Sequence, residues 1–296
     1  MRAPAEAQPL LLSVDFEDWH QLVRRRVGVT DWDRAGPALE RQTEVLLALF
    51  DELGVRATFF ILGLAARTYP VLVRRIAVEG HEIACHGDNH TPVHTQTRAE
   101  FVTDLRAART TIADVTGHVP VGYRAPAFSI TQGCPWAYEV LAQEGFAYDS
   151  SQHDSPRLRG RIRAATGRPH RMHVAGGTLW EFPIAVWQAG LGPVPVGGAS
   201  YWALMPTGLI LRALQRAEPM AGLYLHPQEV DPRPLRAGLP ANAPPGQRLR
   251  AAYRSAQRNL ARRRTADVLR AVSRTHSLIT YREAHARLTD GTPARS

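Results

Sequence analysis

The chain has 296 residues, of which 44% are hydrophobic, and it carries a formal net charge of +9. This length and apolar content suffice for a buried core, and the sequence has no run of about 18 apolar residues that would cross a membrane as a helix. Residues 1–9 lack the long apolar stretch of a secretory signal, so we expect a cytoplasmic protein.

The first half of the chain alternates between strand-like and helix-like segments. Residues 38–53 carry Leu39, Leu46 and Phe50 at helical spacing, and Gly54 ends the pattern. Further helices are expected at 65–79, 98–116 and 136–144, strands at 10–14, 55–62, 81–85 and 121–124, and an irregular loop after the first strand. Repeated strand–helix units of this kind predict a parallel α/β fold.

The second half is less regular and is rich in arginine, glycine and proline. Residues 155–178 are expected to form an inserted loop or hairpin, and residues 231–246 a proline-rich connector. Strands are expected at 181–187, 222–226 and 278–281, and helices at 202–218 and 248–274. We therefore expect one large domain over residues 1–230, and over 231–296 the connector and a basic helical extension packed on it.

All basic residues other than histidine are arginines, and many lie in two clusters, 157–171 and 248–274. Such patches can bind anionic sugars, lipid head groups or nucleic acid, whereas a solvated helix face is the simpler interpretation. No aromatic interleaving or nucleic-acid motif accompanies the charge, so we expect no nucleic-acid partner.

Side chains that bind metals or transfer protons follow several expected strands. His86 and His90 are four residues apart, which places two imidazoles on one side of a turn and suits a shared metal ion. A carboxylate should complete the site, and the best candidates lie after the first strand. In a parallel barrel, functional groups gather at the carboxyl ends of strands. The full set is Asp15, Glu17, Asp18, His86, His90, Arg124, Asp149 and His226.

This set resembles the motifs of the polysaccharide deacetylases of the NodB-homology group, carbohydrate esterase family 4. The resemblance covers residues 10–230, and the C-terminal tail is similar to an extension in a subgroup found with bacterial exopolysaccharide and exosortase systems. Two departures are the separated carboxylates of the first motif and the shortened third motif. The matching segments are Ser13-Val14-Asp15-Phe16-Glu17-Asp18, His86-Gly87-Asp88-Asn89-His90, Arg124-Ala125-Pro126, Asp149-Ser150-Ser151 and Leu223-Tyr224-Leu225-His226.

The resemblance implies a distorted (β/α) barrel of about seven strands with a C-terminal helical extension. It implies one divalent metal ion held by Glu17, His86 and His90, with zinc favoured and cobalt, nickel or iron compatible with the same donors. Asp18 remains a rival ligand, because the family has adjacent aspartates where this chain has Asp15, Glu17 and Asp18.

The resemblance also implies the catalytic roles. Asp15 would be the general base, held by Arg124, and His226 would be the general acid, oriented by Asp149. A backbone N–H near Tyr123 or Arg124 would help to stabilise the oxyanion.

The activity implied is removal of N-acetyl groups from amino sugars of a polysaccharide or its precursor, with release of acetate. The partner would be an acetylated amino-sugar polymer or oligosaccharide, with peripheral contact to a membrane-bound polysaccharide assembly. Hydrolysis of another linear amide or an O-acetyl ester, and a non-catalytic carbohydrate-binding module, are the alternatives.

Overall fold

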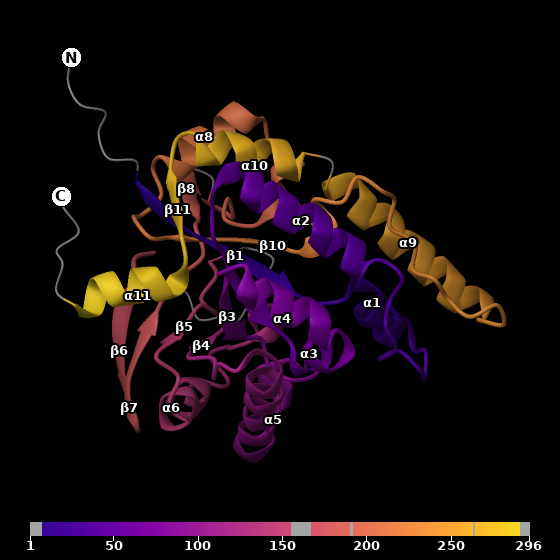
Figure 1. Cartoon of the computed structure of the whole chain (residues 1–296), viewed down its shortest axis with the longest axis horizontal. Coiled ribbons are helices and arrows are strands. Elements are labelled where there is room, and N and C mark those ends of the chain that lie inside the picture. The colour runs from indigo at the N-terminus through magenta and orange to yellow at the C-terminus, as the bar shows by residue number, and fades with distance from the viewer. Residues whose placement is uncertain (1–7, 155–166, 190–191, 263, 291–296) are drawn as a thin grey trace.

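The computed structural model describes residues 8–154, 167–189, 192–262 and 264–290. In this part of the chain a nine-stranded sheet has the order β10-β1-β2-β3-β4-β5-β7-β6, and β11 also pairs with β1 (Figure 1). Its strands are β1 (Pro9–Phe16), β2 (Thr58–Ile61), β3 (Glu82–Cys85), β4 (Gly122–Tyr123), β5 (Tyr148–Asp149), β6 (His170–Val174), β7 (Gly177–Glu181), β10 (Gly222–Leu225) and β11 (Ser277–Ile279).

The sheet is curled into a distorted barrel. All its ladders are parallel except the β6–β7 hairpin. An isolated parallel bridge between Ile184 and Gly222 joins the segment after β7 to β10, at the other end of the strand order. The predicted fold class, a distorted α/β barrel, is confirmed. The hairpin begins within the predicted loop-or-hairpin region, 155–178, but β7 continues to Glu181, beyond its end. Residues 155–166 of that region lie outside the described residues.

Alternation along the strands decides which side chains face the barrel interior. In β1, Leu10, Leu12 and Val14 belong to the large apolar cluster shared with the helices, whereas Leu11 joins a smaller cluster with Phe60, Phe182 and Tyr281. Side chains two residues apart share a face of a strand. Asp15 therefore points to the same interior side as Leu11, at the carboxyl end of β1.

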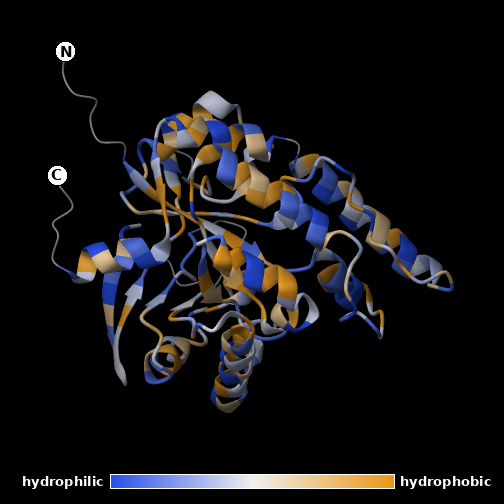
Figure 2. Cartoon of the chain, viewed as in Figure 1, coloured by the Kyte–Doolittle hydropathy of each residue, from blue (hydrophilic) through white to orange (hydrophobic). Residues whose placement is uncertain are grey.

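Helices cover the outside of the sheet, and most agree with the predicted positions. Figure 2 shows orange apolar residues along the central strands and mixed colours along the surrounding helices. The observed helices are α1 (Trp19–Val27), α2 (Leu39–Leu53), α3 (Gly63–Thr68), α4 (Pro70–Val78), α5 (Arg98–Thr116), α6 (Trp136–Gln143), α7 (Ala199–Trp202), α8 (Thr207–Leu214), α9 (Pro245–Ala261), α10 (Thr265–Ser273) and α11 (Tyr281–Thr289).

Two predicted helices are each divided in two, and the helix predicted at 202–218 is shorter, since α7 ends at Trp202 and α8 covers Thr207–Leu214. Pro70 begins α4 and Pro206 precedes α8, because proline lacks the N–H that would continue the preceding helix. The basic helix is divided into α9 and α10 around the buried Arg262, which donates to the carbonyl oxygens of Gln228, Asp231 and Arg233. The predicted strand 181–187 is also wrong in extent, since β7 ends at Glu181 and a separate hairpin, β8 (Trp187–Ala189) with β9 (Gly192–Val194), follows.

Two helices were not predicted. Helix α1 replaces the expected loop after β1, with Asp18 as its N-cap, and packs through Trp19, Val23 and Val27 against Ala251 of α9. Helix α9 extends away from the barrel with α1 beneath it (Figure 1). Helix α11 follows β11 and brings Tyr281 into the barrel interior. The division of the chain at residue 230 stays a prediction.

Across the described residues, none of the helices has the length and apolar character needed to span a bilayer.

Candidate functional site

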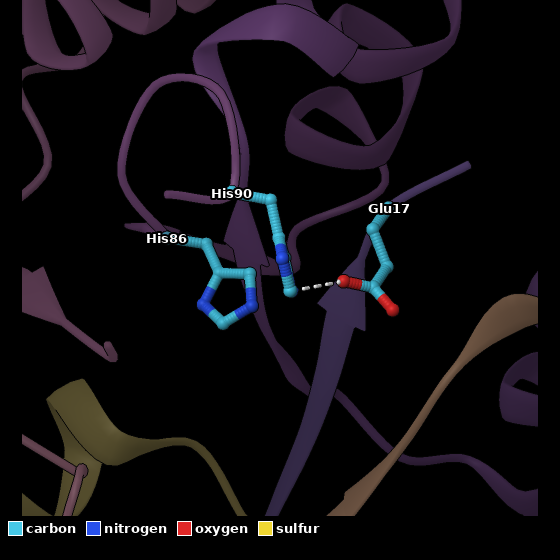
Figure 3. A group of neighbouring side chains, drawn as sticks. All are labelled: Glu17, His86 and His90. Carbon is cyan, nitrogen blue, oxygen red and sulfur yellow. Dashed lines mark ion pairs between the residues drawn. The ribbon is translucent and has the colours of Figure 1, made fainter. Parts of the chain in front are cut away.

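Three side chains of the types that could hold a metal ion converge at the carboxyl end of the barrel. Glu17 follows β1, and His86 and His90 follow β3. One donor atom from each of the three lies within 4.8 Å of the others, and the side chains point toward one another in Figure 3. Glu17 Oε2 is 2.9 Å from His90 Nε2. Two imidazole nitrogens and one carboxylate oxygen are a donor set that suits a zinc-like divalent cation and leaves further positions open.

The loop between the two histidines is held in shape by charged contacts. Arg67 makes a two-pronged contact with Asp88, at 2.6 and 3.0 Å, and the Asp88 N–H donates to Asp104 Oδ2. Gly87 and His90 both have positive φ, 78° and 55°, which turns the chain back so that both imidazoles face Glu17. The cluster is therefore built by the fold around it.

The protonation of the cluster suits a cation. Burial lowers the pKa of His86 to about 4, so its imidazole is neutral near pH 7. His86 Nδ1 donates to the carbonyl oxygen of Arg124 at 2.8 Å, which directs Nε2 toward the cluster. Burial alone would raise the pKa of Glu17, but His90, His226 and His86 outweigh that effect and hold it well below its ordinary value. Glu17 is thus an anionic side chain that faces the imidazoles of the cluster.

Asp15 is held by a fully buried arginine. Arg124 Nη1 donates to Asp15 Oδ1 at 2.7 Å and to Ser13 Oγ at 2.8 Å. The rest of the guanidinium donates to Ser150 and to Tyr281 Oη, and it stacks over the Phe60 ring at 4.0 Å. Each donor direction of Arg124 is therefore used, which fixes the Asp15 carboxylate beside Glu17.

His226 follows β10 and contacts Glu17. Its Nε2 is 3.5 Å from Glu17 Oε1, and its Nδ1 is 3.2 Å from Glu229 Oε2. Burial would lower the pKa of His226, but Glu229, Glu17 and Asp15 outweigh it and raise the pKa to about 9. The imidazolium form is therefore favoured near neutral pH, as a general acid requires.

The predicted pairing of Asp149 with His226 is wrong. Asp149 accepts hydrogen bonds from the backbone and hydroxyl of Ser151 at 2.8 Å, and it interacts with the buried carboxyl group of Glu181. Tyr148 occupies the barrel interior, so alternation turns Asp149 to the other face of the sheet. Ser151 Oγ in turn accepts from Ala125 N at 2.8 Å, which makes Asp149 a support for the segment that carries Arg124.

Asp18, the rival ligand, is used elsewhere. Its carboxylate accepts from the backbone of His20 and Gly36, and the Tyr69 hydroxyl makes a short hydrogen bond to it. These contacts cap α1 and exclude Asp18 from the three-residue cluster. The predicted oxyanion donor also fails in part, since Arg124 N donates to Cys85 O at 2.9 Å.

Sequence reasoning missed two residues of the site. Glu229 follows His226 by three residues, and this short spacing is the signal that could have identified it as the histidine's partner. Tyr281 reaches Arg124 from the C-terminal segment, more than 150 residues away, and no local pattern indicates that contact.

Two family models match consecutive parts of the chain. Residues 27–144 match the polysaccharide deacetylase family, and residues 150–279 match a domain of unknown function, DUF3473. A peptidoglycan deacetylase-like protein of Gibberella zeae is 35% identical over 109 residues, which cover 36% of this chain and 31% of that protein. A peptidoglycan deacetylase of Helicobacter pylori is 33% identical over 107 residues, covering 36% of this chain and 35% of that protein.

The chain thus spans about a third of the length of these curated relatives. The similarity in fold extends over nearly the whole chain. The crystal structure of a Mycobacterium smegmatis protein assigned to the polysaccharide deacetylases superposes with a TM-score of 0.62 at 20% identity, covering 99% of this chain and 94% of that one. The chain is therefore similar to the polysaccharide deacetylase family over residues 27–144 and to the DUF3473 domain over residues 150–279, and it shares the fold of the Mycobacterium smegmatis protein.

Proposed function

We propose that this protein is a metal-dependent hydrolase that removes N-acetyl groups from amino sugars of a polysaccharide or its precursor. The observation that carries the proposal is the convergence of Glu17, His86 and His90 with the Asp15–Arg124 pair and His226 at one end of the barrel. Chitin and peptidoglycan deacetylases among the relatives support an acetamido substrate.

The three-residue cluster would hold one divalent cation, and zinc, cobalt, nickel or iron would suit its donors. When bound, such a cation polarises the acyl carbonyl and makes water easier to deprotonate. The proximity of the neutral His86, the anionic Glu17 and the ring of His90 supports this assignment.

The protein's own groups then move two protons. Asp15, held by Arg124, accepts a proton from the water that attacks the acetyl carbon. His226 donates a proton to the nitrogen as the C–N bond breaks, because an amide anion is a poor leaving group. The water oxygen ends in acetate, and the sugar leaves as a free amine. Glu229 and Glu17 keep His226 charged for this step.

The test is hydrolysis of chitotetraose by the protein loaded with zinc or cobalt, with acetate and free amine measured together. Equal amounts of both products support the proposal. Release of acetate only from O-acetylated xylan, with an alcohol as the second product, would assign the ester alternative. Binding of oligosaccharide without turnover would assign a carbohydrate-binding role.

Asp15→Asn is the matched variant. It keeps the size of the side chain and a hydrogen-bond acceptor for Arg124, but it cannot accept the proton. We expect metal binding to be retained and turnover to fall by about 10²–10⁴-fold. Turnover close to that of the wild type would remove Asp15 as the base.

A cytoplasmic location and contact with a membrane-bound polysaccharide assembly belong to the same proposal.

A further inference from the structure

Three arginines from two helices meet beside the candidate site. Helices α1 and α9 pack through an apolar cluster that includes Val23, Val27 and Ala251. Arg26 lies in the last turn of α1, and Arg254 and Arg258 lie one turn apart on α9. Residues four apart on a helix share a face, so Arg254 and Arg258 are neighbours on α9.

Arg258 connects this group to the site. Its Nη1 donates to Ser200 Oγ at 3.0 Å and lies 3.8 Å from Glu229 Oε1. Glu229 is the carboxylate that contacts His226 Nδ1. The group therefore borders the end of the barrel where the proposed chemistry takes place.

The three guanidinium groups repel one another. The pKa of Arg26 is lowered by burial and then by the positive charges of Arg254 and Arg258, while Glu17 acts in the opposite direction. Arg26 thus lies near both α9 arginines and within electrostatic reach of a proposed metal ligand. Like charges held together in this way destabilise a protein unless an anion joins them.

Two of these arginines lack an anionic partner among the described residues. Within that part of the chain Arg26 and Arg254 form no ion pair and no hydrogen bond, although the arginines that precede Arg26 on α1 donate hydrogen bonds. Arg24 donates to Gly238 O, and Arg25 donates to Asn89 O. Guanidinium groups bind carboxylates and phosphates in a two-pronged manner, so unpaired and convergent arginines suit an anionic ligand.

We propose that Arg26, Arg254 and Arg258 form a subsite for an anionic group, a carboxylate or a phosphate, on the sugar polymer whose acetamido group is hydrolysed. This proposal rests on the proposed function and specifies its substrate class. An acidic amino-sugar polymer is preferred over a neutral one, because its charge lies against the arginines while its acetamido group reaches Asp15.

The test is a binding measurement by titration calorimetry at low salt that needs no turnover. The probes are a heparosan tetrasaccharide, which carries glucuronate carboxylates, and the neutral chitotetraose. We expect the wild type to bind the acidic probe about tenfold more tightly, and R26Q/R254Q to lose most of that preference. A second titration compares the affinity for N-acetylglucosamine 1-phosphate with that for N-acetylglucosamine, and it tells whether the anion recognised is a phosphate.

Arg212→Gln is the matched control. It removes the same charge from an exposed position on a different helix, α8. R212Q should keep the preference for the acidic probe. Equal losses in R212Q and R254Q would overturn the subsite, because they would show an effect of net charge alone. Equal affinity of the wild type for both probes would also overturn it.

Two further outcomes separate the possibilities. If R26Q/R254Q loses binding to phosphatidylglycerol vesicles but keeps the oligosaccharide preference, the arginines serve a lipid surface and the proposal fails. If the preference for acidic sugar is present but no acetate is ever released, the subsite stands and the proposed hydrolase function falls.

Stability gives an independent readout. Since Arg254 is repelled by two neighbours and has no described partner, R254Q should leave the melting temperature unchanged or raise it by about 1–2 °C. A clear fall in the melting temperature would show that Arg254 is a structural residue and would contradict the subsite.

Discussion

Arg124 Nη1 donates to Asp15 Oδ1 over 2.7 Å, and both side chains are buried. This pair joins the carboxyl ends of β1 and β4 at the site. Because the arginine also donates to Tyr281 Oη, the C-terminal segment contributes to the orientation of Asp15. The carboxylate proposed as the general base is thus held by parts of the chain that lie far apart in the sequence.

Arg124→Lys should be strongly destabilising. A lysine ammonium is a point charge that cannot reach Asp15, Ser150 and Tyr281 at once, so buried polar groups lose their partners. We expect the free energy of unfolding to fall by about 2–4 kcal/mol, measured by urea denaturation. A stability equal to that of the wild type would contradict the role given to the guanidinium network.

Glu17→Gln and Asp18→Asn form a matched pair of variants that distinguishes the proposed metal ligand, Glu17, from the residue that caps α1, Asp18. Glu17→Gln should remove most of the affinity for zinc, because the anionic donor is lost. Asp18→Asn should retain the metal but lose about 1 kcal/mol of stability, because it weakens the cap of α1 and the contact with Tyr69. Metal content and melting temperature are measured on both, and the opposite pattern would make Asp18 the ligand.

Glu229→Gln should lower kcat with little change in KM. The variant keeps a side chain of similar size but removes the negative charge that faces His226 Nδ1. We expect a loss of about 10–100-fold in kcat, since the general acid is then less well oriented and charged. Asp149→Asn is the comparison, because Asp149 lies on the other face of the sheet. A larger loss of kcat in Asp149→Asn than in Glu229→Gln, with the fold intact, would favour Asp149 as the partner of His226.

His81 predicts a dependence of stability on pH. This imidazole is buried beside Phe50 and Phe59, and its Nδ1 accepts a hydrogen bond from Ala57 N at 3.2 Å. Burial, helped by Arg56, lowers its pKa from 6.5 to about 4. Between these pH values the unfolded chain binds more protons, so stability falls as the pH decreases through this window.

We expect His81 to account for about 1–2 kcal/mol of that fall, after allowance for screening by solvent. Chemical denaturation at pH 7 and pH 4.5 measures it, and His81→Gln should show a smaller difference between the two pH values. An equal difference in both proteins would assign the pH dependence to other groups.

The sequence predicts much of the site because the strands are parallel. Residues at or just after the carboxyl ends of β1, β3, β4 and β10 must gather at one edge, so the parallel direction of the strands is enough to group Asp15, His86, Arg124 and His226. Alternation also favours Glu17 over Asp18 as the carboxylate of the cluster, because Glu17 lies two residues after Asp15 and so points to the same side of an extended chain.

Other features depend on distant contacts. Asp149 follows a strand end as predicted, but the placement of Tyr148 in the interior turns it away from His226. The contacts of Tyr281 with Arg124, and of α1 with α9, join segments separated by more than 150 residues. Local patterns carry no information on such pairings, so the arginine-rich pattern of α9 does not indicate that this helix borders the site.

The most direct measurement is the metal content of the purified protein by elemental mass spectrometry, for the wild type, His86→Ala and His94→Ala. His94 lies on the same segment but contacts Ser129 O and is outside the three-residue cluster. The account predicts about one divalent ion per chain in the wild type and in His94→Ala, and almost none in His86→Ala. A wild type that binds no metal after incubation with zinc or cobalt, or a His86→Ala variant that keeps its metal, would contradict the proposed centre.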